Sequence, residues 1–362
     1  MKIVFLMNHI VMGGLEKILC EYVKAINEYD GIEVIVVSQH RVKESFFLDF
    51  FKTYNITLID NIFPRHRAHF VLRKLIRNVV IKRKLQKLFD KYDIIIDFAN
   101  FSWSRYIASI NKPKMGWCHG SFLVFDKMTK MHNLDIYDKI VCLTNSCMTM
   151  ACKQYPHLSD KIVHLYNPID YKSISTQQQK SESPDSYFCA VQRLDTDKDV
   201  ATVIKAFNLF SENHPGVKLL IVGDGPLRQS LTELASVNSR IIFTGQVDTP
   251  YSIISGATAL ILSSTTHIGE GLPTVLLEAL ALKTLAISSD VPSGPREILM
   301  DGQSGVLFKP GDYQELSQIL SDVWDCKYDI NAIKTNATAS LRRFDKKRIT
   351  KELIEVIKTI MK

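Results

Sequence analysis

The sequence predicts an α/β protein of two domains, each built on a parallel β-sheet. Short apolar strands alternate with helical patterns along most of the chain, which is typical of parallel strands joined by crossover helices. The alternation stops at a polar stretch, residues 171–186, and then restarts. A length of 362 residues also fits about two domains of roughly 150 residues.

Residues 1–170 hold the first alternation. We expect strands at Lys2–Met7, Glu33–Val37, Asp93–Asp97, Lys114–Cys118, Lys139–Leu143 and Lys161–Leu165, with a helix at Leu15–Ile26. Residues 171–186 lack periodicity and contain a proline near their end, so they are predicted to be an interdomain linker.

The second alternation covers residues 187–344. We expect strands at Tyr187–Val191, Val217–Val222, Arg240–Phe243, Thr258–Leu262 and Thr284–Ser288, and helices at Val200–Glu212, Leu227–Ser236 and Thr274–Leu282. Residues 345–362 form a last predicted helix whose apolar side carries Ile349, Leu353 and Ile357. Such a helix needs a surface to pack on.

Composition excludes several classes of protein. With 23% charged and 46% hydrophobic residues, the chain is neither disordered nor collagen-like. No apolar run approaches the roughly 18 residues of a membrane span, and the apolar run at the N-terminus is too short for a signal peptide. We therefore expect a cytoplasmic protein. The seven cysteines contain no C-x-x-C pair, so we expect reduced, mostly buried thiols and no metal site.

Positive charge is concentrated in one segment. The chain carries a formal net charge of +7, and residues 65–91 hold ten Lys and Arg against a single acid, Asp90. From residue 68 the pattern is that of a basic amphipathic helix. Two interpretations stay open: a solvated helix face, or a surface for anionic membrane headgroups at about 1 kcal/mol per basic residue. Nucleic-acid binding is less favoured, because no Tyr or Trp is interleaved for base stacking. The candidate membrane or acceptor surface is Arg73, Arg77, Lys84 and Lys87.

Loops at the carboxyl ends of strands offer groups for an anionic ligand. Neither half contains the G-x-G-x-x-G fingerprint or a P-loop, which disfavours dinucleotide and P-loop chemistry. Gly13 and Gly14 follow the first strand and precede a helix, where backbone amides can approach an anion. Arg193 and Lys198 lie five residues apart after Tyr187–Val191 and suit a pair of phosphates. Each feature is weak alone.

The stretch from Glu270 to Glu278 is the most informative. Pro273 lies near the first helical position, so the amides of Leu272–Val275 are expected to point toward an anion. The two carboxylates should then lie on the order of 12 Å apart, too far to share a proton. This separation suits the two ends of one long ligand, a diphosphate with a sugar at each end.

With these residues in view, the chain resembles the retaining GT-B glycosyltransferases of family four over nearly its whole length. The matching segments are GGLE (13–16), WCHG with His119, YNPID (166–170), QRLDTDK (192–198), VGDGP (222–226), EGLPTVLLEAL (270–280) and SGPREILMDGQSGVLF (293–308). The resemblance implies two Rossmann-like domains facing a central cleft. Residues 1–170 would bind the acceptor, residues 187–344 would bind the nucleotide sugar, and the helix at 345–362 would pack back on the first domain.

The resemblance also implies roles for individual residues. Arg193 and Lys198 would hold the diphosphate, Glu278 the ribose hydroxyls and Glu270 the hexose hydroxyls, and His119 would lie beside the transferred sugar. Donor-binding residues would be Gly13, Gly14, Gly223, Gly271, Leu272, Pro273, Thr274 and Glu278, with Gly14 supplying a backbone contact near the reacting centre. Gln192 stands where the family often has glycine, and Asp199 follows Lys198; both departures concern loop geometry.

The expected function is transfer of a hexose or N-acetylhexosamine, galactose-type and from a UDP-sugar, to a glycan or lipid-linked acceptor in lipopolysaccharide or polysaccharide synthesis. Work at the inner face of the plasma membrane would fit the basic helix. We expect no cofactor and no metal, and we interpret Asp195-x-Asp197 as a coincidental D-x-D motif. A nucleotide-sugar 2-epimerase of the same fold and a non-enzymatic glycolipid-binding protein are the alternatives.

Overall fold

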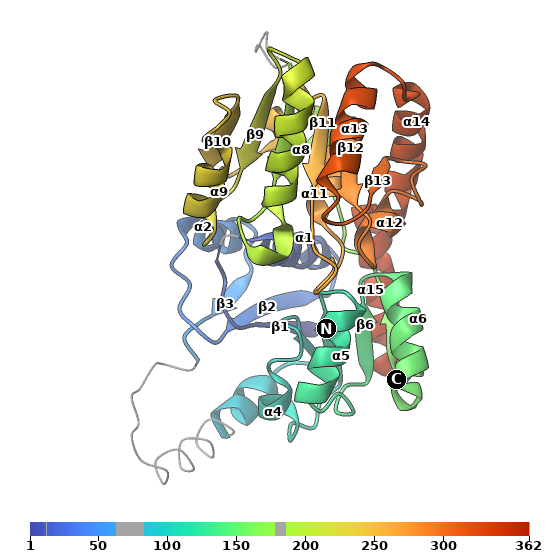
Figure 1. The fold of residues 1–362 in the computed structure, drawn as a ribbon. Helices are drawn as coiled ribbons and strands as arrows, with labels where there is room; N and C mark the ends of the chain where they lie inside the picture. Colours follow the sequence, from blue (N-terminus) through green and yellow to red (C-terminus); the bar gives the residue numbers. More distant parts are fainter. Residues whose placement is uncertain (12, 63–82, 178–185, 362) are drawn as a thin grey trace, which may run out of the picture. The chain divides into compact units, whose positions relative to one another are not determined.

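The computed structural model describes residues 1–11, 13–62, 83–177 and 186–361. They divide into two compact units (Figure 1). Unit 1 comprises Met1–Pro168 together with Lys346–Lys362, and unit 2 comprises Ile169–Asp345. Unit 1 is therefore built from two separate stretches of the chain.

Unit 1 forms a parallel sheet of seven strands within the described residues, in the order β3-β2-β1-β4-β5-β6-β7. Its strands are β1 (Lys2–Met7), β2 (Glu33–Ser38), β3 (Thr57–Ile59), β4 (Ile94–Asp97), β5 (Lys114–Cys118), β6 (Lys139–Cys142) and β7 (Ile162–His164). Its helices are α1 (Gly14–Asn27), α2 (Ser45–Thr53), α4 (Ser104–Ile107), α5 (Phe122–Met131), α6 (Asn145–Gln154), the 3₁₀ turn Pro156–Leu158 and α15 (Lys346–Ile360). Because β1 lies between β2 and β4, the order of connection reverses on either side of β1.

The last helix, α15, packs on α1 within unit 1. Its apolar side chains Ile349, Leu353 and Ile357 are fully buried. At its start the Lys346 ammonium lies 3.3 Å from the Glu21 carboxylate of α1. The amphipathic pattern thus has the packing surface that it needs.

Unit 2 forms a parallel sheet of six strands in its described residues, in the order β10-β9-β8-β11-β12-β13. These are β8 (Tyr187–Val191), β9 (Lys218–Val222), β10 (Ile241–Gly245), β11 (Ala259–Leu262), β12 (Leu285–Ser289) and β13 (Val306–Phe308). The helices are α7 (Tyr171–Thr176), α8 (Val200–Asn213), α9 (Arg228–Ala235), α10 (Tyr251–Gly256), α11 (Thr274–Ala281), α12 (Gly294–Ile298), α13 (Tyr313–Trp324) and α14 (Ile330–Ser340), with 3₁₀ turns at Thr196–Lys198 and Leu341–Phe344.

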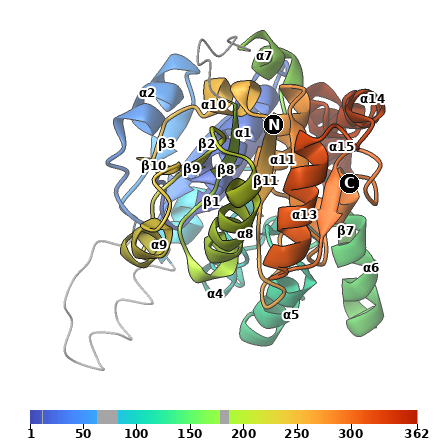
Figure 2. The ribbon, with the colours of Figure 1, turned by 45° about the horizontal axis from the view of Figure 1, so that its top comes forward.

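Helices cover both faces of the unit 2 sheet (Figure 2). Helices α8, α9 and α13 pack together on one face, and α7, α10, α11 and α14 pack together on the other. Strand β8 is central, between β9 and β11. The loops at the carboxyl ends of β8 and β11 therefore meet near the middle of the sheet, where open α/β sheets bind ligands.

The predicted linker is wrong for its first residues, because 171–176 form helix α7. The Asp170 carboxylate accepts a hydrogen bond from the Ser173 amide at 3.1 Å and caps this helix, and buried Ile174 anchors it. Residues 178–185 lie outside the described residues. Strands β3 and β13 were not predicted; both are edge strands of three residues each.

The cysteines are free, as predicted, and five of the seven are buried; Cys152 is half-buried and Cys326 is exposed. Of the basic segment 65–91, residues 63–82 lie outside the described part, and residues 83–89 are helical. Leu85 and Phe89 of this short stretch are buried in the core of unit 1.

Candidate functional site

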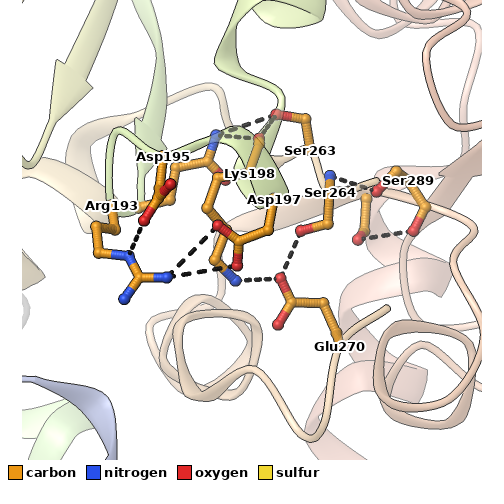
Figure 3. Close-up of polar contacts among 10 residues, drawn as sticks. Arg193, Asp195, Asp197, Lys198, Ser263, Ser264, Glu270 and Ser289 are labelled. Carbon is orange, nitrogen blue, oxygen red and sulfur yellow. Dashed lines mark hydrogen bonds and ion pairs between the residues drawn. The ribbon is translucent and has the colours of Figure 1, made fainter. Parts of the chain in front are cut away.

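The loop after β8 brings Arg193 against two carboxylates (Figure 3). The Arg193 Nε lies 3.4 Å from the Asp195 carboxylate, and its Nη2 lies 3.4 Å from Asp197. The Arg193 side chain is 60% exposed. Long, exposed ion pairs contribute little stability, so this guanidinium can exchange its partners for a ligand. The two acids of the D-x-D motif thus lie beside a cation.

Lys198, from the same loop, is paired differently. Its ammonium donates to Oε1 of Glu270, which also accepts from the Ser264 hydroxyl (Figure 3). The Lys198 and Glu270 side chains are only 19% and 10% exposed. Both residues were predicted to bind a ligand, but their contact with each other was not predicted. In the structure they form one buried unit that presents a carboxylate and an ammonium together.

Three serines hold this unit in place, and the sequence analysis missed them. The Ser263 hydroxyl donates to the Lys198 carbonyl at 2.8 Å and accepts from the Gln192 amide at 3.0 Å. The Ser264 backbone amide donates to the Ser289 hydroxyl at 2.8 Å. Ser263 and Ser264 follow directly after the apolar strand β11, and such a buried polar pair at a strand end is the signal that could have identified them.

Gly223 and Gly225 let the next loop lie against the Arg193 loop. Gly223 has φ of +134°, and a Cβ there would stand 2.1 Å from the Gln192 carbonyl oxygen. A Cβ at Gly225 would stand 2.3 Å from the Leu194 carbonyl oxygen. Gly223 therefore permits a close approach of two backbones that a Cβ would block, and its donor-binding role stays a prediction.

Helix α11 begins at Thr274, as predicted. Pro273 is its N-cap rather than its first residue, so the free amides at its start belong to Thr274 and Val275, while Leu272 precedes the helix. No side chain caps this end. The positive end of the helix dipole therefore stays open to an anion. Glu278 lies on the second turn and is half-buried.

The segment before α12 contains a strained residue. Ser293 has φ of +97°, in a region that L-residues rarely adopt, and it forms an isolated parallel bridge with Glu270. A Cβ on neighbouring Gly294 would stand 2.1 Å from the Gly271 carbonyl oxygen. Strain of about 1–3 kcal/mol per residue is typical of functional sites. Gly271 and Glu270 are thus held by the SGPREI segment, 293–298.

In unit 1, Gly13 is the N-cap of α1 and Gly14 its first residue. The Glu16 carboxylate folds back toward them, so that a Cβ on Gly13 would stand 2.6 Å from its Oε2. Burial raises the pKa of Glu16 to about 7, partly opposed by backbone hydrogen bonds from Glu16 itself and Val11. The glycine loop is therefore packed on a carboxyl group that changes charge near neutral pH.

His119 follows β5 in the same unit. Its ring lies edge-on to Phe98, with centroids 4.3 Å apart, and its backbone amide donates to Asn100 Oδ1 at 2.8 Å. Burial lowers the pKa of His119 to about 3, against a smaller opposing effect of a hydrogen bond to the Phe98 backbone. The buried Nε2 has no protein partner among the described residues. This imidazole is neutral at physiological pH and suits a hydrogen bond to a ligand, not the donation of a proton.

The candidate membrane surface is described only in part. Arg73 and Arg77 lie outside the described residues, while Lys84 and Lys87 are exposed on the helical stretch 83–89. Across the part of the chain that the structure describes, no helix is long and apolar enough to span a bilayer. Within the same residues, no cluster of three or more His, Cys, Asp or Glu side chains could hold a metal.

Two family models match the chain. The model described as "Glycosyl transferases group 1" matches residues 172–359, and the model described as "Glycosyltransferase Family 4" matches residues 12–173. Together they cover both units. A solved structure, Anabaena Alr3699/HepE in complex with UDP-glucose, has a TM-score of 0.80 and 18% identity, and the match covers 99% of this chain and 100% of that chain. This likeness confirms the predicted GT-B fold class.

Two curated relatives have names that state the sugar they transfer. A Campylobacter jejuni protein named GalNAc-alpha-(1->4)-GalNAc-alpha-(1->3)-diNAcBac-PP-undecaprenol alpha-1,4-N-acetyl-D-galactosaminyltransferase is 25% identical over 99% of this chain and 98% of its own length. The lipopolysaccharide 1,6-galactosyltransferase of Salmonella typhimurium is 29% identical over 46% of this chain and 48% of its own length. For two further relatives the match likewise spans about half of their length, 42% and 52%.

Proposed function

Because the chain belongs to the glycosyl transferases of group 1, whose model matches more than half of it, we propose a specific reaction for it. The protein transfers a galactose-type hexose or N-acetylhexosamine from a UDP-sugar to a glycan or lipid-linked acceptor. The transfer retains the anomeric configuration and serves the synthesis of cell-surface lipopolysaccharide or polysaccharide.

The observation that carries this proposal is the cluster of Arg193, Lys198 and Glu270 beside the open N-terminus of α11. Breaking the anomeric C–O bond leaves negative charge on the departing diphosphate. Arg193, Lys198 and the Thr274 amide supply positive charge where it develops, which lowers the barrier. Glu270 accepts hydrogen bonds from hydroxyl groups and suits the sugar itself.

The donor sugar is inferred from relatives. The printed names of the Campylobacter and Salmonella relatives specify N-acetylgalactosamine and galactose, which share the galacto configuration. The HepE structure contains UDP-glucose, which supports a uridine nucleotide as the donor. The acceptor follows the undecaprenol-linked glycan in the name of the Campylobacter relative.

Metal independence belongs to the same proposal. In phosphate chemistry a divalent ion neutralises the leaving group, and here two side-chain cations and a helix N-terminus provide that charge. Retention of configuration comes from the family resemblance, and we assign no nucleophile.

Donor specificity is tested with a thermal-shift panel of UDP-, GDP- and ADP-sugars. A ligand that binds only the folded state raises the Tm, so UDP-galactose and UDP-N-acetylgalactosamine should give the largest shifts. Arg193→Gln should abolish the shift, whereas Arg348→Gln on α15 should keep it. A product with inverted anomeric configuration, or conversion of the UDP-sugar without acceptor as in an epimerase, would contradict the proposal.

Peripheral membrane binding by the segment 65–91 is tested separately. Replacing Arg73, Arg77, Lys84 and Lys87 with Gln should remove roughly 4 kcal/mol of attraction to anionic vesicles, because each basic residue contributes about 1 kcal/mol. Binding of the parent should weaken with added salt. If the quadruple variant binds anionic vesicles as well as the parent, the segment is a solvated face.

A further inference from the structure

Unit 1 contains a polar pocket of about 490 Å³ that none of the assigned residues lines. Asn8 and Gln39, which follow β1 and β2, form one side, and Ser102, Arg105 and His132 form another. The pocket lies at the carboxyl ends of β1, β2 and β4, where the order of the sheet reverses. Open α/β sheets bind ligands at this position, and the volume falls in the usual range for ligand pockets, about 300–1,000 Å³.

The pocket lining combines one cationic donor, Arg105, with amides and hydroxyls that can donate or accept. The Asn8 side-chain Oδ1 faces the Ser102 hydroxyl at 2.8 Å, and the same hydroxyl lies 2.7 Å from the Ala99 carbonyl oxygen. With Oδ1 turned toward Ser102, the Asn8 NH₂ group is available to donate. The Arg105 guanidinium donates to the Tyr106 hydroxyl and stacks on its ring, with 4.6 Å to the centroid. Among the described residues, the hydrogen-bond partner given for Arg105 is the Tyr106 hydroxyl and not a carboxylate, and no Asp or Glu lines the pocket. The pocket therefore favours a ligand that brings negative charge to Arg105 and polar groups to the amides and hydroxyls.

Hydrogen bonds fix the backbone on the side of the pocket that carries Ser102 and Arg105. The buried Asp97 carboxylate accepts from the Ala99 amide at 3.2 Å, the Trp103 amide at 2.9 Å and the Tyr137 hydroxyl at 2.7 Å. These bonds fix the turn that carries Ser102 and leads into α4. The Ser104 hydroxyl of α4 lies 3.1 Å from His132 Nδ1 at the end of α5, which ties the two helices together (Figure 1). The donors are thus held in place before a ligand arrives.

We propose that this pocket binds the oxyanion of an acidic saccharide, a phosphate or carboxylate carried on a sugar, as the recognition element of the acceptor. That the bound saccharide belongs to the acceptor rests on the proposed function. Arg105 holds the oxyanion, because its planar guanidinium matches phosphate and carboxylate geometry. The Asn8 amide and the Gln39 side chain take sugar hydroxyls next to it.

The test is calorimetric titration of the full chain, with saturating UDP present so that the nucleotide site is filled. The probes are hexose 1-phosphate, hexuronate, neutral hexose and inorganic phosphate. We expect hexose 1-phosphate or hexuronate to bind at least tenfold more tightly than neutral hexose and inorganic phosphate. Whichever of the two binds identifies the source of the charge.

Arg105→Gln should weaken that binding roughly ten- to hundredfold, the range expected for a charge-assisted hydrogen bond. Arg348→Gln, an equal change of charge on α15, should leave it unchanged. Because Arg105 is exposed, the variant should keep the parent's Tm and its affinity for UDP. If neutral hexose binds as tightly as the acidic sugars, if no probe binds, or if Arg105→Gln has no effect, the proposal is wrong. Failure of UDP-sugar binding with intact acidic-sugar binding would instead overturn the proposed function alone.

Discussion

Replacing Lys198 and replacing Arg193 should change the free energy of unfolding by very different amounts, although both are cations of one loop. Lys198→Met removes the ammonium and leaves the Glu270 carboxylate 10% exposed with Ser264 as its hydrogen-bond donor. Removing one partner of a buried ion pair costs about 3–5 kcal/mol. Since Lys198 itself retains 19% exposure, we expect the lower end, about 3 kcal/mol. Arg193→Met removes an exposed cation, so we expect a change within about 0.5 kcal/mol.

Calorimetric unfolding of the whole chain separates these cases. For a unit of this size, 1 kcal/mol shifts the Tm by about 2–4 °C, so Lys198→Met should lower the unit 2 transition by roughly 6–12 °C. The double variant Lys198→Met/Glu270→Gln removes both charges and should recover most of that loss. Both single variants should lower transferase turnover, because both cations act on the leaving group.

Two outcomes would refute the reasoning on the ion pair. One is a double variant whose loss of Tm equals the sum of the two single losses, which would mean that Lys198 and Glu270 are not coupled. The other is an equal loss of Tm in Arg193→Met and Lys198→Met, which would mean that burial does not distinguish them.

Three further predictions follow from single features. Burial favours the protonated form of Glu16, so ionising its carboxyl group destabilises the folded state as pH rises from about 4.5 through 7, by about 3 kcal/mol in total. Glu16→Gln should therefore raise the urea midpoint more at pH 8 than at pH 5. An equal effect at both pH values would contradict this. Gly223→Ala should destabilise unit 2 by about 3 kcal/mol or more, because its Cβ meets a carbonyl oxygen at positive φ; an unchanged melting temperature would be unexpected. EDTA should leave transfer activity intact, and a loss that Mn²⁺ or Mg²⁺ restores would assign Asp195 and Asp197 to a metal.

The strands that the sequence predicts best are those whose apolar runs end abruptly. Lys2–Met7, Lys114–Cys118 and Tyr187–Val191 match β1, β5 and β8 residue for residue. Strands β3 and β13 were missed because three residues are too few to show a pattern, and they form only through the neighbouring strand. Helix α7 was missed because one buried residue, Ile174, and a capping carboxylate hold it.

The candidate site was likewise predictable only in part. Residue types and spacing were sufficient to single out Arg193, Lys198 and Glu270 as charged groups for a ligand. Their pairing was not predictable, because Lys198 and Glu270 are 72 residues apart and meet only when β8 and β11 lie side by side. The neutral state of His119 also depends on burial, which follows from packing and not from spacing.

The return of α15 to unit 1 affects how the protein is made. Residues 1–168 leave the ribosome well before 346–360, and translation proceeds at about 5–20 residues per second. The intervening unit 2 therefore delays the last helix by roughly 9–35 s. During that interval the side of α1 that α15 covers is exposed to water, so the nascent chain carries an apolar surface that is open to chaperones. Unit 2 is one continuous stretch, so it can complete its fold before α15 completes unit 1.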